Sequence, residues 1–336
     1  MEQYAIDSFS DDDIDLFQEY LTSLCENDPS LLSFNVGADL DWSYEDTLDS
    51  SQVQALASAL LRNTTLRELY LNHSFLFDVN VEVLASALRN HSTLTHLSLS
   101  NNGISVIGAS AVANLLSDKN TSLVVLDLSE NCIGPEGATL LSKALLENST
   151  VTSLYLSDND IGNIGAEALA DVLLETTSAL TELILRNNNI GDVGAKALAF
   201  ALQSNNTLST LLLEGNKIAG IGVQVLTAAV LQSNTTLRDF RWNNWSPPPN
   251  LASHLERNYT LWLTQFWTPF RHASFSDMTP CHPMILTKDM TPCHPMILTT
   301  LLCSQVIFFP PHLCWYIFSF WQRQHFTLLR YRTWER

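Results

Sequence analysis

The chain has 336 residues and a formal net charge of −18, with 35 Asp and Glu residues against 17 Lys and Arg residues. This excess of carboxylates argues against nucleic acid as a partner, because nucleic-acid binding depends on Lys and Arg side chains that neutralise phosphates. It also argues against docking on an anionic membrane surface. The charge favours instead a protein partner that carries a basic patch.

Residues 1–35 predict a helical N-terminal cap. Ser10 and Asp13 have the spacing of a capping box, in which two side chains close the start of a helix. Apolar residues then recur at helical spacing, at Ile14, Phe17, Leu21 and Leu24. We expect this apolar stripe to cover the exposed end of a repeat array, since such arrays need a terminal unit with a polar outer face.

The first residues contain neither the basic segment nor the apolar run of a secretory signal. Of the six cysteines, only Cys25 and Cys132 lie in the acidic part of the chain, which is too few for a disulfide framework. We therefore expect a cytoplasmic protein with reduced thiols.

One pattern returns between residues 66 and 237. Its opening residues follow one another at intervals of 28 or 29 residues, at Leu66, Leu94, Leu123, Val151, Leu180, Leu208 and Leu237. Apolar residues stand three and five positions later, and the ninth position of five units is an asparagine: Asn102, Asn131, Asn159, Asn188 and Asn216. A glycine then opens a stretch rich in Ala and Leu, at Gly108, Gly137, Gly165, Gly194 and Gly222. This periodicity predicts a strand followed by a helix in each unit.

The pattern resembles the ribonuclease-inhibitor-like class of leucine-rich repeats. The motif Leu-x-x-Leu-x-Leu-x-x-Asn, the following Ile-Gly-x-x-Gly-Ala and the alternation of 28 and 29 residues carry the resemblance. It implies an α/β leucine-rich-repeat solenoid over residues 36–265, a horseshoe with parallel strands on its concave face and helices on its convex face. The class includes ribonuclease inhibitors, the sensor arrays of nucleotide-binding immune receptors and Ran GTPase-activating proteins.

Three consecutive prolines at residues 247–249 end the array, because proline continues neither a strand nor a helix. One short helix over residues 250–264 is expected to close it. Residues 266–336 are rich in aromatic residues and proline without a regular period, so we expect a poorly ordered tail. The uncharged stretch 301–321 is long enough to cross a bilayer, but Pro310 and Pro311 weaken it as a spanning helix, so we do not expect a membrane anchor.

The candidate binding site follows from the alternation of side chains along a strand, which places every second residue on the concave face. Aromatic and acidic residues gather there over the middle repeats, and tyrosine is a favoured anchor at interfaces. The predicted partner-binding residues are Tyr70, Asp127, Glu130, Tyr155, Asp158, Glu182 and Arg186. The alternative is that these positions simply vary on a solvated face.

The recurrent asparagines are predicted to be structural, since Asn side chains bond backbone groups in turns. Nine Asn-x-Ser/Thr sequons occur, and six of them fall at one phase of the repeat, where a polar helix-to-strand turn explains them better than glycosylation does. Cys281-His282 and Cys293-His294 lack zinc-ligand spacing and belong to a duplicated segment, so no metal is expected. No catalytic motif is present, and no cofactor is expected.

The sequence therefore predicts a non-enzymatic scaffold that binds a protein partner on its concave face. Two alternatives stay open. The first is a regulator of a small GTPase, similar to Ran GTPase activators, for which Arg186 is the arginine that the regular concave columns offer before the last unit. The second is a sensing array of the innate-immune type, although the nucleotide-binding motif of those receptors does not occur in this chain.

Overall fold

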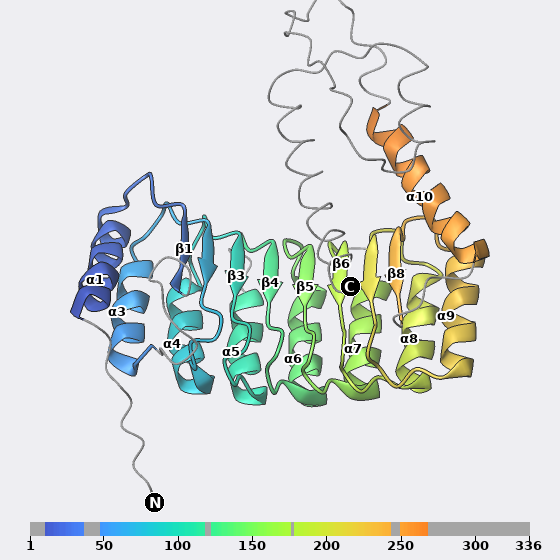
Figure 1. The fold of residues 1–336 in the computed structure, drawn as a ribbon, viewed down its shortest axis with the longest axis horizontal. Helices are drawn as coiled ribbons and strands as arrows, with labels where there is room; N and C mark the ends of the chain where they lie inside the picture. The colour runs from blue at the N-terminus through green and yellow to red at the C-terminus, as the bar shows by residue number, and fades with distance from the viewer. Residues whose placement is uncertain (1–10, 37–47, 118–121, 176–177, 243–248, 268–336) are drawn as a thin grey trace, which may run out of the picture. The chain divides into compact units, whose positions relative to one another are not determined.

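The computed structural model describes residues 11–36, 48–117, 122–175, 178–242 and 249–267 (Figure 1). The chain divides into two compact units, Met1–Thr264 and Gln265–Arg336, and nearly all described residues belong to the first unit. The predicted tail beyond residue 267, the uncharged stretch 301–321 and the duplicated Cys-His pairs lie outside the described residues. Among the helices of the described part, none is long and apolar enough to cross a membrane.

Eight short strands of the described residues form one parallel sheet, in which the strands follow one another in chain order. They are β1 Ser33–Asn35, β2 Glu68–Tyr70, β3 His96–Ser98, β4 Val125–Asp127, β5 Ser153–Tyr155, β6 Glu182–Ile184, β7 Thr210–Leu212 and β8 Asp239–Arg241. Each strand from β2 onward begins two residues after an opening residue of the repeat. The register pairs equivalent positions of consecutive repeats, for example Tyr70 with Ser98 and Leu126 with Leu154.

Helices α1 to α9 form a second row along one side of the sheet (Figure 1). They are α1 Asp11–Glu26, α3 Ser50–Leu60, α4 Phe77–Leu88, α5 Val106–Leu116, α6 Gly134–Glu147, α7 Gly162–Leu174, α8 Asp192–Leu202 and α9 Gly220–Gln232. The last described helix, α10 Pro249–Trp267, follows β8. Helices α3 to α9 each pack against the next helix of the series. This arrangement confirms the predicted fold, an α/β solenoid of leucine-rich repeats. Helix α10 also agrees with the helix predicted for residues 250–264.

The core lies between the strands and the helices and runs through every repeat. The middle residue of each strand is buried: Phe34, Leu69, Leu97, Leu126, Leu154, Leu183, Leu211 and Phe240. The opening residues of the repeats and the inward Ala and Leu residues of the helices are buried with them. Full burial of a leucine side chain contributes about 1.5–3 kcal/mol to the stability of the fold. The apolar side chains that pack between neighbouring repeats therefore hold each repeat in the stack.

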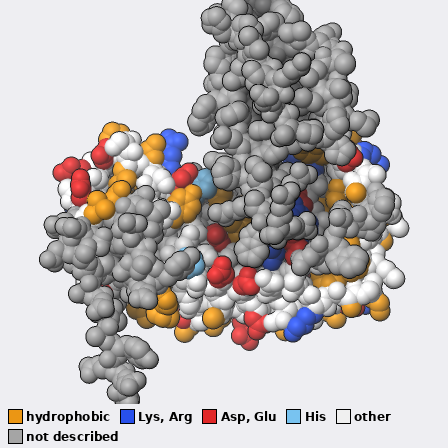
Figure 2. Space-filling model, in the orientation of Figure 1, with side chains coloured by type: hydrophobic (Ala, Val, Ile, Leu, Met, Phe, Trp, Pro, Cys, Tyr) orange, Lys and Arg blue, Asp and Glu red, His pale blue; other side chains and the backbone are white. Residues whose placement is uncertain are grey.

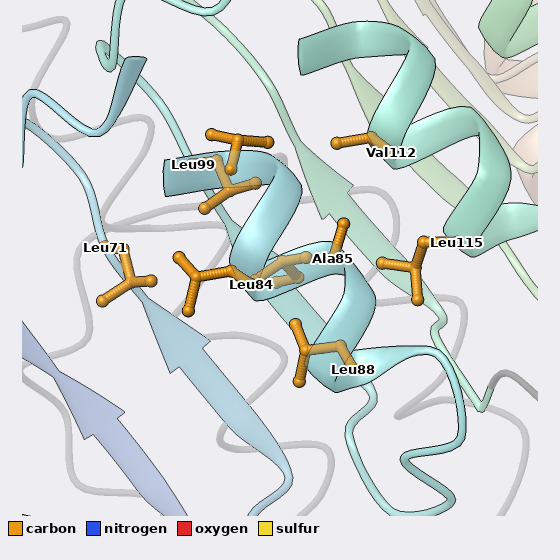
Figure 3. A pocket seen from close by; sticks show the side chains of 9 residues that line it. Leu71, Leu84, Ala85, Leu88, Leu99, Val112 and Leu115 are labelled. Atoms are coloured by element: carbon orange, nitrogen blue, oxygen red, sulfur yellow. The ribbon is translucent and has the colours of Figure 1, made fainter. Parts of the chain in front are cut away.

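An enclosed gap of about 10 Å³ lies inside this core between α4, α5 and the ends of β2 and β3 (Figure 3). Its walls are aliphatic and include Leu71, Leu84, Leu99 and Val112. A gap of this size holds at most one water, and a water needs polar partners that these side chains do not provide. The gap is therefore a packing defect of the core and not a ligand site.

Helix α1 packs against α3 at the first end of the sheet. Its Phe17, Leu21 and Leu24 are buried, as the apolar stripe requires. The ring of Tyr20 stacks on Phe34 of β1, with 4.9 Å between the ring centroids. These contacts support the proposal that the helix is a cap; the residues of the predicted capping box lie outside the described side chains.

The recurrent glycines lie inside the first turn of the helices and not at their first residue. At Gly165, an added Cβ would lie 2.1 Å from Cγ2 of Ile161 and 2.9 Å from Cβ of Ala138 in the preceding repeat. An added Cβ at Gly137, Gly194 or Gly222 would likewise lie close to Cγ2 of an isoleucine and to Cβ of an alanine in the preceding repeat. The glycine is therefore required because consecutive helices approach each other closely at this point.

We predict that Gly165→Ala lowers the free energy of unfolding by about 1–3 kcal/mol, the usual range for an overpacked core site. The measurement is urea unfolding followed by far-ultraviolet circular dichroism. Gly220→Ala is the matched control, because a Cβ at Gly220 meets nothing within 4 Å and should raise stability by about 0.5 kcal/mol through the unfolded chain. Equal stabilities of the two variants would show that helix approach is not limiting.

Several sequon asparagines hold the helix-to-strand turns on the far side of each repeat. The side-chain amide of Asn205 donates to the carbonyl of Leu173 in the preceding repeat at 2.9 Å. Its Oδ1 accepts from the backbone N–H groups of Thr207 and Leu208. Asn63, Asn148 and Asn234 make equivalent bonds. The repeat therefore uses these side chains structurally.

His91 occupies the same turn position in the repeat of α4. Its Nδ1 accepts from the backbone N–H of Leu94 at 3.2 Å, as Asn Oδ1 does elsewhere. Its Nε2 is buried and has no hydrogen-bond partner among the described residues. Burial holds the pKa of His91 below its ordinary value, because the charged, doubly protonated ring would lose its hydration there.

This pKa shift predicts a stability loss in acid. Because the folded protein binds the proton less readily than the unfolded chain, stability is full above the ordinary His pKa and falls as pH drops through that value toward the folded pKa. We expect His91→Asn, which restores the usual turn residue, to lose less unfolding free energy than the native chain between about pH 7.5 and about pH 5.5. Urea unfolding at both pH values measures the difference, and parallel losses would exclude His91 as the cause.

Candidate functional site

The candidate site lies on the open face of the sheet, defined here as the first and third residues of each strand, which flank the buried middle residue. The strand register places Tyr70, Ser98, Asp127 and Tyr155 side by side on consecutive strands. It also places Ser153 beside Glu182. Because side chains alternate along a strand, these residues point away from the helices. The structure therefore brings four of the predicted residues, Tyr70, Asp127, Tyr155 and Glu182, to one face.

Tyr155 connects two strands of this face. Its hydroxyl donates a hydrogen bond to Oε2 of Glu182 on β6 at 3.0 Å. Burial raises the pKa of Tyr155 above its ordinary range, and the negative charges of Glu182 and Asp127 add to the rise. The phenol therefore stays protonated and holds the Glu182 carboxylate in a fixed position.

Asp127 is also held in place by hydrogen bonds. Its Oδ1 accepts from the backbone N–H of Ser129 at 2.9 Å, and its Oδ2 accepts from the hydroxyl of Ser98 at 3.2 Å. The hydroxyl of Ser98 also lies 2.6 Å from Oδ1 of Asn72. Tyr70 donates to Glu68 at 3.3 Å on the same strand. The acidic and aromatic side chains are thus fixed before any partner arrives.

Glu130 and Asp158 lie at the rim, where the strands turn toward the helices. Both are exposed, and both adopt the left-handed backbone conformation, with φ of 58° and 57°. The equivalent turn residue of a later repeat is Gly215, with φ of 74°. This turn fixes the direction of the two side chains beside the open face, although a left-handed non-glycine residue costs about 1–2 kcal/mol.

The carboxylates on and beside the open face differ in whether a basic side chain pairs with them. Arg186 contacts Glu214 through two hydrogen bonds of 3.1 and 3.2 Å, and Arg241 contacts Asp239 through two of 2.8 Å. Within the described residues, no Lys, Arg or His lies at ion-pair distance from the other carboxylates of the site: Asp127, Glu130, Asp158 and Glu182. Figure 2 shows several acidic side chains near the middle of the view, with Lys or Arg side chains beside some of them.

Arg186 therefore lies at the border of the candidate site, already paired with a carboxylate. Sequence reasoning missed Glu214 as its partner. The signal was present, because the two residues hold the same position in consecutive repeats and the register places such residues side by side. A role for Arg186 in GTP hydrolysis would require the guanidinium to leave Glu214.

The predicted asparagine ladder connects successive repeats through the backbone. Oδ1 of Asn131 accepts from the N–H groups of Asn102 and Ile104 at 2.9 and 3.0 Å. Its amide donates to the carbonyl oxygens of Leu99 and Ser129. Asn188 bonds the preceding repeat in the same way. A buried backbone group left without a partner costs about 1–3 kcal/mol, so these side chains satisfy groups that the turn would otherwise leave unpaired.

A second set of bonds between repeats was not expected from the sequence. Oδ1 of Asp78, in the first turn of α4, accepts from the backbone N–H groups of Ser105 and Gly108 at the start of α5. Asn163 binds Gly191 and Gly194 in the same way, so a side chain of one helix caps the next. In the described residues, no group of three His, Cys, Asp or Glu side chains is placed to hold a metal.

Comparisons with known proteins agree with this architecture. Four segments match the family model described as "Leucine Rich repeat": residues 90–113, 119–142, 147–170 and 178–199. The chain therefore carries leucine-rich repeats. A search of curated proteins finds no match.

The solved structures that are similar to the chain include the following two. One is "Leiomodin-1 Actin-Binding Site 2 (ABS2)", with 16% identity, a TM-score of 0.29 and coverage of 77% of this chain and 98% of that chain. The other is the tropomodulin C-terminal domain of Caenorhabditis elegans, with 13% identity, a TM-score of 0.32 and coverage of 74% and 97%. Both TM-scores are low, so the actin binding in the name of the first structure is a property of that protein and carries no conclusion for this chain.

We predict that Glu182→Gln lowers the pKa of Tyr155 toward its ordinary value, since the substitution removes the neighbouring negative charge. The measurement is the pH titration of the Tyr155 ring-carbon signal by nuclear magnetic resonance, assigned with Tyr155→Phe. Asp239→Asn is the control, because Asp239 is paired with Arg241 and is not among the causes of the shift. An identical titration in both variants would contradict the coupling of Tyr155 to Glu182.

Proposed function

We propose that this leucine-rich-repeat chain is a non-enzymatic scaffold that binds a protein partner on the open face of its sheet. Tyr70, Asp127, Tyr155 and Glu182 form the centre of the proposed site, and Glu130 and Asp158 form its rim. The presence of a full helix in each regular repeat and the alternation of 28 and 29 residues support assignment to the ribonuclease-inhibitor-like class.

One observation carries the proposal: four carboxylates of the site form no ion pair in the described part of the chain, whereas Glu214 and Asp239 do. The charge of Arg238 acts on Glu182 without forming an ion pair. Carboxylates that form no ion pair attract Lys and Arg side chains, and complementary charge sets both the choice of partner and the rate of association. We therefore infer that the partner presents a basic segment. The half-buried tyrosines add apolar contact area beside the charges.

The hydrogen bonds of the face support binding without rearrangement. Asp127 and Glu182 are held by Ser98, Ser129 and Tyr155, and the strands beneath them are fixed by the stacked repeats. A surface that is already ordered avoids the loss of side-chain freedom that binding otherwise requires.

We also propose a cytoplasmic location. Cys25 and Cys132 are exposed free thiols, which suits a reducing compartment. Asn63, Asn205 and Asn234 are sequon residues that are buried and hydrogen-bonded within the turns, so their amides are not accessible to a glycosylating enzyme.

The proposal is tested with the full chain immobilised as bait in a cytosolic lysate. The site variant is Asp127→Asn/Asp158→Asn/Glu182→Gln. The control is Glu147→Gln/Glu167→Gln/Asp171→Asn, which removes the same charge from exposed residues of α6 and α7. We expect a protein held by the native chain and by the control to bind the site variant at least about tenfold more weakly, a difference of about 1.4 kcal/mol.

Titration of that protein at rising salt completes the test, because binding carried by charge must weaken as salt screens it. Equal losses in the site and control variants would show that net charge, and not the open face, directs binding. If the retained protein is a small GTPase, GTP hydrolysis with native chain and with Arg186→Ala decides the regulatory alternative.

A further inference from the structure

The strand-to-helix turns of two neighbouring repeats expose a group of apolar side chains. They belong to the turn after β2 and to the starts of α4 and α5, and we name them the Phe rim patch. Its members and exposed fractions are Phe75 46%, Phe77 56%, Val79 71%, Val106 36% and Ile107 63%. The two rings lie 6.3 Å apart between centroids. Phe77 also lies against Gly103, since a Cβ there would be 2.9 Å from its ring.

The backbone at the two phenylalanines is unfavourable for bulky residues. Phe75 and Phe77 adopt left-handed φ values of 49° and 50°. At the position of Phe75, later repeats with the same backbone use Gly103, Asp160 and Asn189; at the position of Phe77 they use Gly134 and Gly162. Left-handed backbone in a bulky residue is rare because the side chain crowds the carbonyl. Phe75 and Phe77 therefore destabilise the backbone of the turn, although their side chains are largely exposed to solvent.

A single exposed aliphatic residue does not require a partner. Ile164, Val193 and Ile221 stand at the same helix position as Val79 and Ile107 and are also exposed. The Phe rim patch differs because two exposed aromatic rings in contact and Val106 stand beside Val79 and Ile107 at the starts of the same two helices. Such a group of aromatic and branched side chains is typical of interaction surfaces.

The patch continues into a groove of about 450 Å³ between α4 and α5. Its walls include Glu82 and Ser86 on α4 and Ile107, Ser110 and Asn114 on α5. These residues recur three, four or seven positions apart, so the groove follows the two helices for about two turns. Its floor is the packed core shown in Figure 3, since Ala85 and Leu115 line both the groove and the enclosed gap. A groove of this form accepts the apolar face of a third helix.

Charge indicates which helix fits. Glu82 is exposed in the groove and forms no ion pair within the described residues. Arg89 at the other end has an interaction of its own. A second copy of this chain would bring another 18 negative charges to a surface of the same sign, which opposes self-association. The lack of an ion pair at Glu82 within the described residues and the negative charge of the chain as a whole favour an occupant that places a positive charge beside Glu82.

We propose that the Phe rim patch and the α4–α5 groove bind an amphipathic helix of a partner protein. Apolar side chains of that helix contact Phe75, Phe77 and Ile107, and a Lys or Arg beside them pairs with Glu82. This surface is separate from the open face of the sheet, so its test does not depend on the site proposed above.

The test uses the full chain and a fluorescent helical peptide of about 18 residues, with Leu on one face and Lys on the rest. The patch variant is Phe75→Asn/Phe77→Gly, which installs residues that this chain already uses at those turn positions. We expect the dissociation constant to rise at least about tenfold in the patch variant. Glu82→Gln should raise it about threefold and reduce its dependence on salt. The control variant Glu147→Gln/Glu167→Gln/Asp171→Asn, which lies outside both proposed surfaces, should leave it unchanged. The site variant Asp127→Asn/Asp158→Asn/Glu182→Gln is measured beside it.

Thermal unfolding separates binding from folding. The melting temperature of the patch variant should equal or exceed that of the native chain, because the substitutions relieve the left-handed backbone; a clear fall would show that the phenylalanines are structural and would overturn the proposal. An unchanged dissociation constant in the patch variant, or a loss confined to the site variant, would overturn it as well. A dimer in sedimentation velocity that the patch variant abolishes would make a second copy the occupant.

Discussion

Hydrogen bonds between consecutive repeats are the constraint on which the rest of the structure depends. Each strand is short, and each turn leaves backbone N–H and C=O groups that no strand partner satisfies. Asn131 and Asn188 bond these groups to the preceding repeat, and Asn205 does so on the opposite side of the core. Because burial of unpaired backbone groups is costly, the repeats can stack only in phase.

In-phase stacking decides where the functional side chains lie. Equivalent residues of neighbouring repeats become neighbours in space, so residues 28 or 29 apart in the chain act as pairs. Arg186 with Glu214 is such a pair. Tyr155 and Glu182, which are 27 residues apart, bond across the same two neighbouring strands. In-phase stacking also places Asp78 against the start of α5, 27 to 30 residues further along the chain. The open face and the rim are therefore two surfaces of the same stack of repeats. A substitution on one surface need not disturb the structure of the other.

The two surfaces differ in what they offer a partner. The open face presents fixed carboxylates beside half-buried tyrosines, whose arrangement follows from hydrogen bonds within the sheet. The rim presents exposed aromatic side chains on unfavourable backbone, together with a groove between helices. Departures from local preference that the fold does not need are where function is expected, and Phe75 and Phe77 are such departures.

The sequence by itself determined the repeat and its phase. The spacing of leucines and asparagines predicted the strands, the helices and the columns of the open face, because a solenoid converts sequence period directly into position. It did not show that Arg186 forms an ion pair with Glu214, or that Nε2 of His91 has no hydrogen-bond partner among the described residues. Nor did it show that the ring of Phe77 lies against Gly103. Those facts depend on side-chain rotamers, backbone φ values and contacts between repeats, which only the tertiary structure decides. The reason is that side chains at the same spacing in the sequence can either form a hydrogen bond or ion pair with a neighbour or remain without one.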